Sequence, residues 1–108
     1  MNTMRTEGDF EDNARPAADL LRVLANERRL QVLCALRRQE LSVGQLAEHV
    51  GLSQSALSQH LARLRADRVV DTRRDGQTIF YRIADGEVMT VLDAVAGVMA
   101  RRRERTSR

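Results

Sequence analysis

Apolar positions recur at helical spacing through most of this chain. The clearest case is the stretch 52–66, in which three leucines fall on one narrow helical face: Leu57, Leu61 and Leu64. Ser53 is a good N-cap, and Gly51 can close a preceding helix in the left-handed conformation. The pattern predicts a short helix that buries its leucines and exposes its other side.

The exposed side of this predicted helix carries small hydroxyl and amide groups where a solvated helix usually carries charges: Gln54, Ser55, Ser58 and Gln59. Side chains of this kind let a helix lie deep in the major groove of DNA, where they hydrogen-bond to base edges and phosphates. The competing interpretation is a capped surface helix of a small bundle.

The preceding segment, 42–50, favours the DNA-binding interpretation. Ser42 and Gln45 have the spacing of a capping box, and four residues form a buried stripe: Val43, Leu46, Ala47 and Val50. Two short amphipathic helices joined by Gly-Leu-Ser are typical of a helix-turn-helix in which the second helix reads DNA.

Two further helices precede this pair. Pro16 fits the first turn of a helix that starts near Ala14 and has one apolar side. Asn26 caps a second helix over 26–38, whose apolar residues run nearly all round its circumference. A helix of that kind is expected in the middle of a fold.

After the recognition helix the hydrophobic period changes to two. Residues 69–74 and 77–83 flank Asp75-Gly76, a strong hairpin signal. We expect the core to receive Ile79, Tyr81 and Ile83, and the tip to gather Arg73, Arg74, Gln77 and Thr78. A basic hairpin at this place is a wing, which lays arginines along the minor groove or on phosphates. The alternative is an ordinary solvated turn.

The last helix begins after Asp85, a predicted N-cap, and carries a long apolar stripe: Val88, Val91, Leu92, Val95, Val98 and Met99. So small a domain cannot cover this stripe together with that of the first helix. We therefore predict a homodimer that pairs the first and last helices through Leu20, Leu21, Val91, Leu92 and Val95.

Composition and charge agree with a single nucleic-acid-binding domain. The 108 residues are 43% hydrophobic and 3% aromatic, which suits a core of aliphatic helices, and all 18 basic residues are Arg. We divide the chain into an acidic tail (1–13), a winged helix-turn-helix domain with dimerisation helices (14–100) and a basic tail (101–108). Two arginines against four acidic residues give residues 1–15 a net charge of −2, and five arginines against one glutamate give residues 101–108 +4.

Both tails are expected to be disordered and solvated, although the basic one could add nonspecific DNA affinity. No signal peptide or long apolar run is present, so we expect a soluble, cytoplasmic protein without a membrane partner.

Three segments between about Leu20 and Leu92 carry a family resemblance: LANERRLQVLCAL, LSVGQLAEHVGLSQSALSQHLARLR and DTRRDGQTIFYRI. They resemble the ArsR/SmtB family of winged-helix repressors, in particular the branch containing BigR, HlyU and NolR. The resemblance implies a mainly α fold with a β-hairpin wing and a homodimer that pairs its first and last helices. Its palindromic operator in double-stranded DNA would be read by helix 52–66 in the major groove, with the 69–83 wing alongside.

The resemblance also places individual side chains. Gln54, Ser55, Ser58 and Gln59 match the groove-facing positions of the family. His60 matches the family's SxHL pattern, yet on a helical wheel it lies near the leucines, so packing or phosphate contact fits as well as base reading. Arg63 follows on the same helix, and we count both among the expected DNA contacts.

Sensing chemistry is where this chain departs from its relatives. Metal-sensing members carry a CVC pair where this chain has Ser42-Val43-Gly44, and one Cys with two scattered His cannot supply a four-ligand site. We therefore expect neither a metal nor another cofactor. Redox-sensing members have two cysteines; Cys34 matches the first, and Met99-Ala100 stands near the second position. Cys34 is either a lone redox-responsive thiol or a small buried hydrophobe.

Two other classes of protein fit this sequence less well. An enzyme would need a nucleophile and an oriented base, and the chain offers only Cys34 with His49 or His60 at no orienting spacing, so we expect no enzymatic activity. A winged helix that binds proteins instead of DNA should present an apolar or aromatic recognition face. The polar face of helix 52–66 favours DNA.

Overall fold

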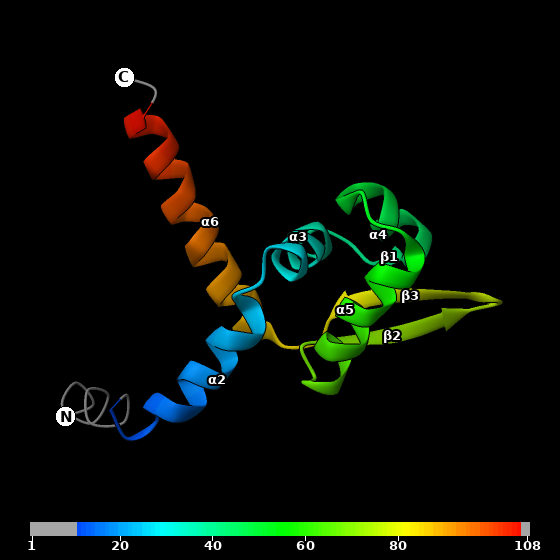
Figure 1. Cartoon of the computed structure of the whole chain (residues 1–108), viewed down its shortest axis with the longest axis horizontal. Helices are drawn as coiled ribbons and strands as arrows, with labels where there is room; N and C mark the ends of the chain where they lie inside the picture. The colour runs from blue at the N-terminus through cyan, green and yellow to red at the C-terminus, as the bar shows by residue number, and fades with distance from the viewer. Residues whose placement is uncertain (1–10, 107–108) are drawn as a thin grey trace.

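The fold is mainly helical with one small antiparallel sheet. The computed structural model describes residues 11–106. Its elements, in order, are α2 (Ala14–Leu24), α3 (Glu27–Leu36), β1 (Leu41–Ser42), α4 (Val43–Val50), α5 (Gln54–Ala66), β2 (Val70–Asp75), β3 (Thr78–Ile83) and α6 (Gly86–Thr106). In Figure 1, α3, α4, α5 and the sheet form a head, from which α2 and α6 diverge as two arms.

The predicted helix caps are all formed. The side chain of Asn26 accepts a hydrogen bond from the backbone N–H of Arg29 at 3.1 Å. Ser42 and Gln45 make both bonds of the capping box, at 3.2 and 2.9 Å. Gly51 closes α4 with a φ of +69°, where glycine is strongly favoured, and the two residues after it lead into α5. The sequence therefore fixes the tight turn between α4 and α5.

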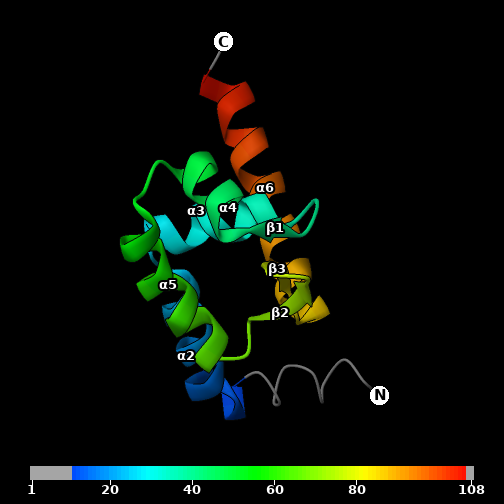
Figure 2. The same ribbon diagram turned by 90° about the vertical axis from the view of Figure 1, so that its right-hand side faces the viewer.

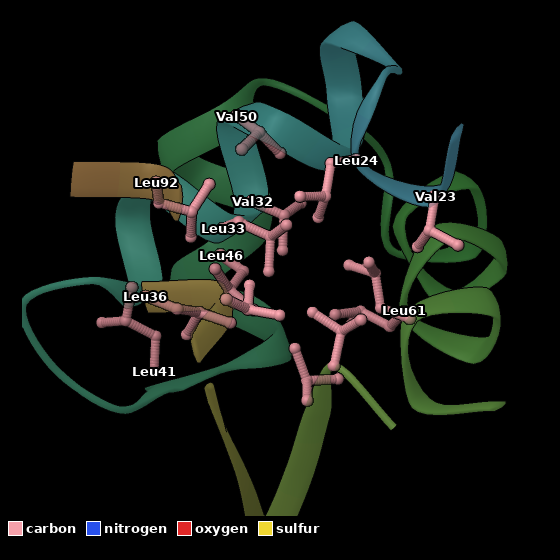
Figure 3. Packing of buried hydrophobic residues seen from close by; sticks show 14 of the residues in the cluster. Val23, Leu24, Val32, Leu33, Leu36, Leu41, Leu46, Val50, Leu61 and Leu92 are labelled. Carbon is pink, nitrogen blue, oxygen red and sulfur yellow. The ribbon is translucent and has the colours of Figure 1, made fainter. Parts of the chain in front are cut away.

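A single aliphatic core joins these elements (Figure 3). Every described helix contributes to it, as do β1, β2 and Val69, and within residues 11–106 no polar or charged residue is buried. The three leucines of the recognition helix are at most 1% exposed. Because the sheet and all the helices share this core, α5 is held rigidly against the rest of the head.

Helix α3 lies in the middle of the head, in contact with α4, α5 and β3. The sequence predicted apolar residues nearly all round this helix, but only one side of α3 is buried. Val32, Leu33 and Leu36 are buried, whereas Cys34 is exposed. The expectation that Cys34 is a buried hydrophobe is wrong for the single chain, because no element within residues 11–106 covers its side of α3.

The sheet has the order β1-β3-β2, and all its pairs are antiparallel. Asp75 pairs with Thr78, so the two-residue turn is Gly76-Gln77, one residue later than predicted. Gly76 has a φ of +65°, which fits the first position of a type II′ turn. Strand β1 was not predicted, because two residues are too few to show alternation. Tyr81 and Ile83 pack on the core as expected.

Ile79 does not reach the core, contrary to the prediction. It is 39% exposed, because it lies one position from the turn end of the hairpin, beyond the reach of the helices.

Helix α6 continues to Thr106, so Arg101 to Thr106 form exposed helical turns and not the disordered tail that the sequence suggested. Most of the predicted acidic tail, residues 1–10, and the last two residues lie outside the described part of the chain. From residue 11 to 106, no helix is both long enough and apolar enough to cross a membrane.

Candidate nucleic-acid interface

The helix-turn-helix presents the polar side of α5 outward. Gln54, Ser55, Ser58 and Gln59 are all exposed. Ser53 caps the helix by accepting a hydrogen bond from the backbone N–H of Ala56 at 3.2 Å, which leaves the four side chains free of the capping role. Ser55, Ser58 and Gln59 thus share one open surface on the side of α5 away from the buried leucines, and Gln54 is exposed beside it at the first turn of the helix.

The hairpin lies directly beside α5, which packs against β2. Figure 2 turns this face of the molecule toward the viewer. Helix α5 and the hairpin stand next to each other there, as a recognition helix and a wing must if they are to contact adjacent parts of one duplex.

The register of the hairpin separates its two arginines. Arg74 pairs with Ile79, on the side of the hairpin that also carries Tyr81 and the core contacts. Arg73 pairs with Phe80 and therefore lies on the other side. Both arginines lie near the turn end of the hairpin, but they point to opposite faces, because neighbouring residues of a strand alternate. Arg74 and the turn residue Gln77 are exposed and accessible to DNA.

Arg73 is held by the protein itself. Its Nε lies 2.7 Å from Oε1 of Glu40, and its guanidinium carbon lies 5.0 Å from the centre of the Phe80 ring. These contacts fix the base of the wing to the loop before β1. The sequence could not reveal this role, because Glu40 and Arg73 are 33 positions apart.

Arg82 extends the same network. Its Nε lies 2.6 Å from Oδ1 of Asp71 on the neighbouring strand, and Glu40 is also within reach at 3.7 Å. The hydrogen bond and charge of Asp71, followed by the charge of Glu40, raise the pKa of Arg82. This guanidinium stays charged and braces the outer side of the wing, a role that sequence reasoning also missed.

Two predicted DNA contacts on α5 are less open than the rest. The Nε of Arg63 lies 2.7 Å from Oδ2 of Asp67, so a phosphate would have to compete with that carboxylate. His60 is half-buried, which agrees with its position near the leucines on the helical wheel. Both are therefore secondary members of the surface.

The predicted dimer residues on the two arms, α2 and α6, differ in how far they are exposed. Leu21 and Val95 are 56% and 45% exposed, whereas Leu20 and Val91 pack partly on the core. Leu92 is only 3% exposed, so the expectation that it lacks cover within its own chain is wrong. Between the arms lies an apolar groove of about 200 Å³ lined by Leu21, Leu24, Ala25, Leu30, Val91, Leu92 and Val95. Val98 and Met99, further along α6, are also exposed.

Cys34 opens onto a polar hollow between the ends of α3 and α4. The hollow is lined by Gln31, Cys34, Ala35, Arg37, Arg38, Gln39, His49 and Val50. Arg37 is engaged there, because its guanidinium makes bonds of 2.6 and 2.9 Å to Asp93 of α6. Among residues 11–106 there is no cluster of three or more His, Cys, Asp or Glu side chains that could hold a metal ion.

The geometry defines a class of protein. A helix-turn-helix with a polar recognition helix and a β-hairpin packed beside it is a winged helix-turn-helix, a DNA-binding architecture. The sequence model of the family described as "Bacterial regulatory protein, arsR family" matches residues 26–72. The chain belongs to this ArsR family, and it is a DNA-binding transcriptional regulator.

Similar proteins agree on this assignment. The transcriptional activator HlyU of Vibrio cholerae is 52% identical over 85 residues, 79% of each chain. The crystal structure of the transcriptional repressor BigR from Xylella fastidiosa matches with a TM-score of 0.80 at 36% identity, over 85% of this chain and 94% of that one. A homodimeric winged helix-turn-helix domain, Mb0332 from Mycobacterium bovis, matches with a TM-score of 0.73 at 31% identity, over 87% and 91%. The resemblance inferred from the sequence is confirmed.

Proposed function

We propose that the chain is a homodimeric, sequence-specific repressor that reads a palindromic operator, with α5 in the major groove and the β2–β3 wing alongside. The observation that carries the proposal is the open, uncharged polar surface of α5. Four hydroxyl and amide side chains there are exposed, and the capping bond to the backbone is made by Ser53, whose hydroxyl lies 3.4 Å from that of Ser55.

The side chains divide into two roles. Gln54 and Gln59 carry amides, which form paired hydrogen bonds with adenine in the major groove, so we assign them to base reading. Ser55 and Ser58 are short enough to let the helix approach closely and to bind phosphate or base edges. Arg74 and Gln77 of the wing are assigned to the backbone or minor groove, because both are exposed, Arg74 next to the turn end of the hairpin and Gln77 in the turn itself.

The homodimer follows from the apolar surface of the two arms. Leu21, Val95, Val98 and Met99 are large apolar side chains that stand exposed on the two arms, and exposed apolar surface of this kind marks sites of protein association. A two-fold axis through this surface would present two α5 helices to one duplex, and a palindromic operator mirrors that symmetry. The Mb0332 domain is described as homodimeric, which supports the same assembly here.

Repression is proposed because occupancy by such a dimer is itself inhibitory. Recognition helices and wings that fill the grooves of an operator exclude polymerase from a promoter that overlaps it. Relatives carry both roles, since BigR is described as a repressor and HlyU as an activator. Placing the binding site relative to the promoter start distinguishes the two roles, because an activator site lies upstream of the polymerase footprint.

The test compares two glutamine variants with a matched control. Gln54→Ala and Gln59→Ala should each lose about 1–3 kcal/mol of binding to the operator per contact, with little change on random DNA. Gln39→Ala removes an exposed amide that lies outside α5 and the hairpin, in the hollow beside Cys34, and should change neither affinity. Binding is measured by fluorescence anisotropy on operator and scrambled duplexes. Equal losses on both duplexes would contradict base reading by these glutamines.

A further inference from the structure

Two arginines and two carboxylates lie together on the outer face of the wing, and we call them the wing cluster. The Nε of Arg73 lies 2.7 Å from Oε1 of Glu40, and the Nε of Arg82 lies 2.6 Å from Oδ1 of Asp71. The second oxygen of Glu40 lies 3.7 Å from Arg82 and joins the two pairs. Two positive and two negative side chains give the cluster no net formal charge.

The wing cluster is open to solvent, so its contribution is mainly electrostatic. Its side chains are 32% to 48% exposed, and ion pairs at that exposure contribute little to folding stability. At about 0.1 M salt a charge is felt over about 10 Å, which is several times the length of the contacts within the cluster. A DNA phosphate near this face of the wing therefore meets nearly balanced charge, although two arginines stand there.

Arg74, the next residue along β2, is placed differently. It lies on the opposite face of the hairpin, and within residues 11–106 it makes no ion pair. Sequence-independent affinity for DNA grows with the number of phosphates that arginines neutralise. Each wing therefore presents the full charge of Arg74, whereas Glu40 offsets the charge of Arg73.

The charge of Arg73 has different consequences on operator DNA and on random DNA. On an operator, base contacts from Gln54 and Gln59 fix where the head lies, so an arginine gains a contact only if a phosphate stands beside it. On a random sequence nothing fixes the head, and it settles where its arginines meet the most phosphates. An Arg73 without its carboxylate would therefore strengthen binding to random DNA more than binding to the operator.

We propose that Glu40 is a specificity-determining residue, whose carboxylate offsets the charge of Arg73 and thereby limits binding to DNA of random sequence. The inference rests on the proposed sequence-specific DNA binding and adds to it a residue outside α5 and the hairpin. Glu40 lies in the loop before β1, 33 positions from Arg73, so only the fold brings the two side chains together.

The substitution Glu40→Gln tests the proposal, because it removes the charge but keeps the size of the side chain and one acceptor oxygen for Arg73. The variant should bind a random-sequence duplex roughly tenfold more tightly at about 0.1 M salt, and the slope of log affinity against log salt concentration should steepen by about 0.9 per chain. On the operator duplex that selection from a random library enriches, the gain should stay below about threefold. Fluorescence anisotropy measures both affinities, and circular dichroism confirms folding.

Two controls accompany this variant. Glu104→Gln makes the same change of charge near the end of α6, which stands apart from the hairpin in Figure 1, and it should change neither affinity by much. The double variant Glu40→Gln/Arg73→Ala should lose the gain on random DNA relative to Arg73→Ala alone, because the gain passes through Arg73.

The outcomes separate this inference from the proposed function. A gain that is larger on random DNA and absent from the double variant supports the role of Glu40. Unchanged binding, equal gains on both duplexes, a gain that persists without Arg73, or a loss on both duplexes from a loosened wing would each overturn it and leave sequence-specific binding in place. An unmodified chain that binds both duplexes equally removes the proposed function, and with it this inference.

Discussion

Aspartate should have different effects at two nearby positions of α6, unfolding the chain at one and preventing its dimerisation at the other. Leu92 is 3% exposed and belongs to the core of its own chain, whereas Val95 is 45% exposed and belongs to the proposed dimer surface. Leu92→Asp should therefore unfold the chain, and Val95→Asp should leave it folded but monomeric. The two residues lie three positions apart on the same helix, so a difference between the two variants reports on burial and not on where in the fold the change was made.

The magnitudes follow from burial. Truncating a buried Leu costs about 2–5 kcal/mol, and burying an unpaired carboxylate adds to that loss. Domains of this size are stable by roughly 5–15 kcal/mol, so Leu92→Asp removes much or all of the stability. At Val95 the dimer can still bury about half the side chain, worth roughly 1 kcal/mol per chain and about 2 kcal/mol per dimer. That loss alone raises the dissociation constant roughly 30-fold.

Urea unfolding and sedimentation measure the two effects separately. Ala94→Asp is the control, because Ala94 is exposed on α6 but lies off the apolar stripe. It should change neither stability nor assembly by much. A Leu92→Asp protein that is folded and monomeric, or a Val95→Asp protein that dimerises normally, would refute this division of α6 into a core face and a partner face.

Three further predictions concern the head. Arg74→Ala should weaken binding to every duplex and reduce the slope of log affinity against log salt concentration by about one. Arg73→Ala should weaken DNA binding less, because Arg73 is held by Glu40. Anisotropy titrations at several salt concentrations measure both effects. Cys34 should react with a thiol-alkylating reagent in the folded protein, because it is exposed. Oxidation should change operator affinity little, since the sequence has one cysteine and cannot form an internal disulfide. A large loss of affinity on oxidation that is absent in Cys34→Ser would show that a single thiol suffices to regulate DNA binding. Arg68→Gly should stabilise the fold in urea unfolding, because Arg68 holds a φ of +62° after α5. Relief of left-handed strain of about 1–2 kcal/mol should outweigh the roughly 0.4–1 kcal/mol that the extra unfolded-state entropy of glycine costs; a lower urea midpoint would contradict this.

Local signals predicted the helices and their caps well. Ser42, Gln45, Gly51 and Ser53 act within a few residues of themselves, so their roles can be seen in the sequence. The polar side of α5 was predicted for the same reason, because the leucines that define its opposite face lie on the same helix.

Features that depend on distant partners could not be predicted. The ion pair of Arg73 with Glu40 and that of Arg37 with Asp93 join segments 33 and 56 positions apart. The exposure of Cys34 and the burial of Leu92 depend on which elements happen to cover each face, and periodicity does not show that. Strand alternation puts Arg73 and Arg74 on opposite faces of the hairpin, but which of the two shares the core-facing side depends on how the hairpin packs, which the sequence does not show.

Selection from a random duplex library tests the central claim most directly. The full chain is incubated with the library, and bound duplexes are recovered and sequenced over several rounds. A dimer that reads DNA with two α5 helices should enrich an inverted repeat whose half-sites are centred about 10–10.5 base pairs apart, or a multiple of that spacing. The enrichment should disappear with Gln54→Ala/Gln59→Ala but persist with Gln39→Ala. Enrichment of no sequence, or of a single unrepeated site, would contradict a symmetric dimer that reads bases through α5.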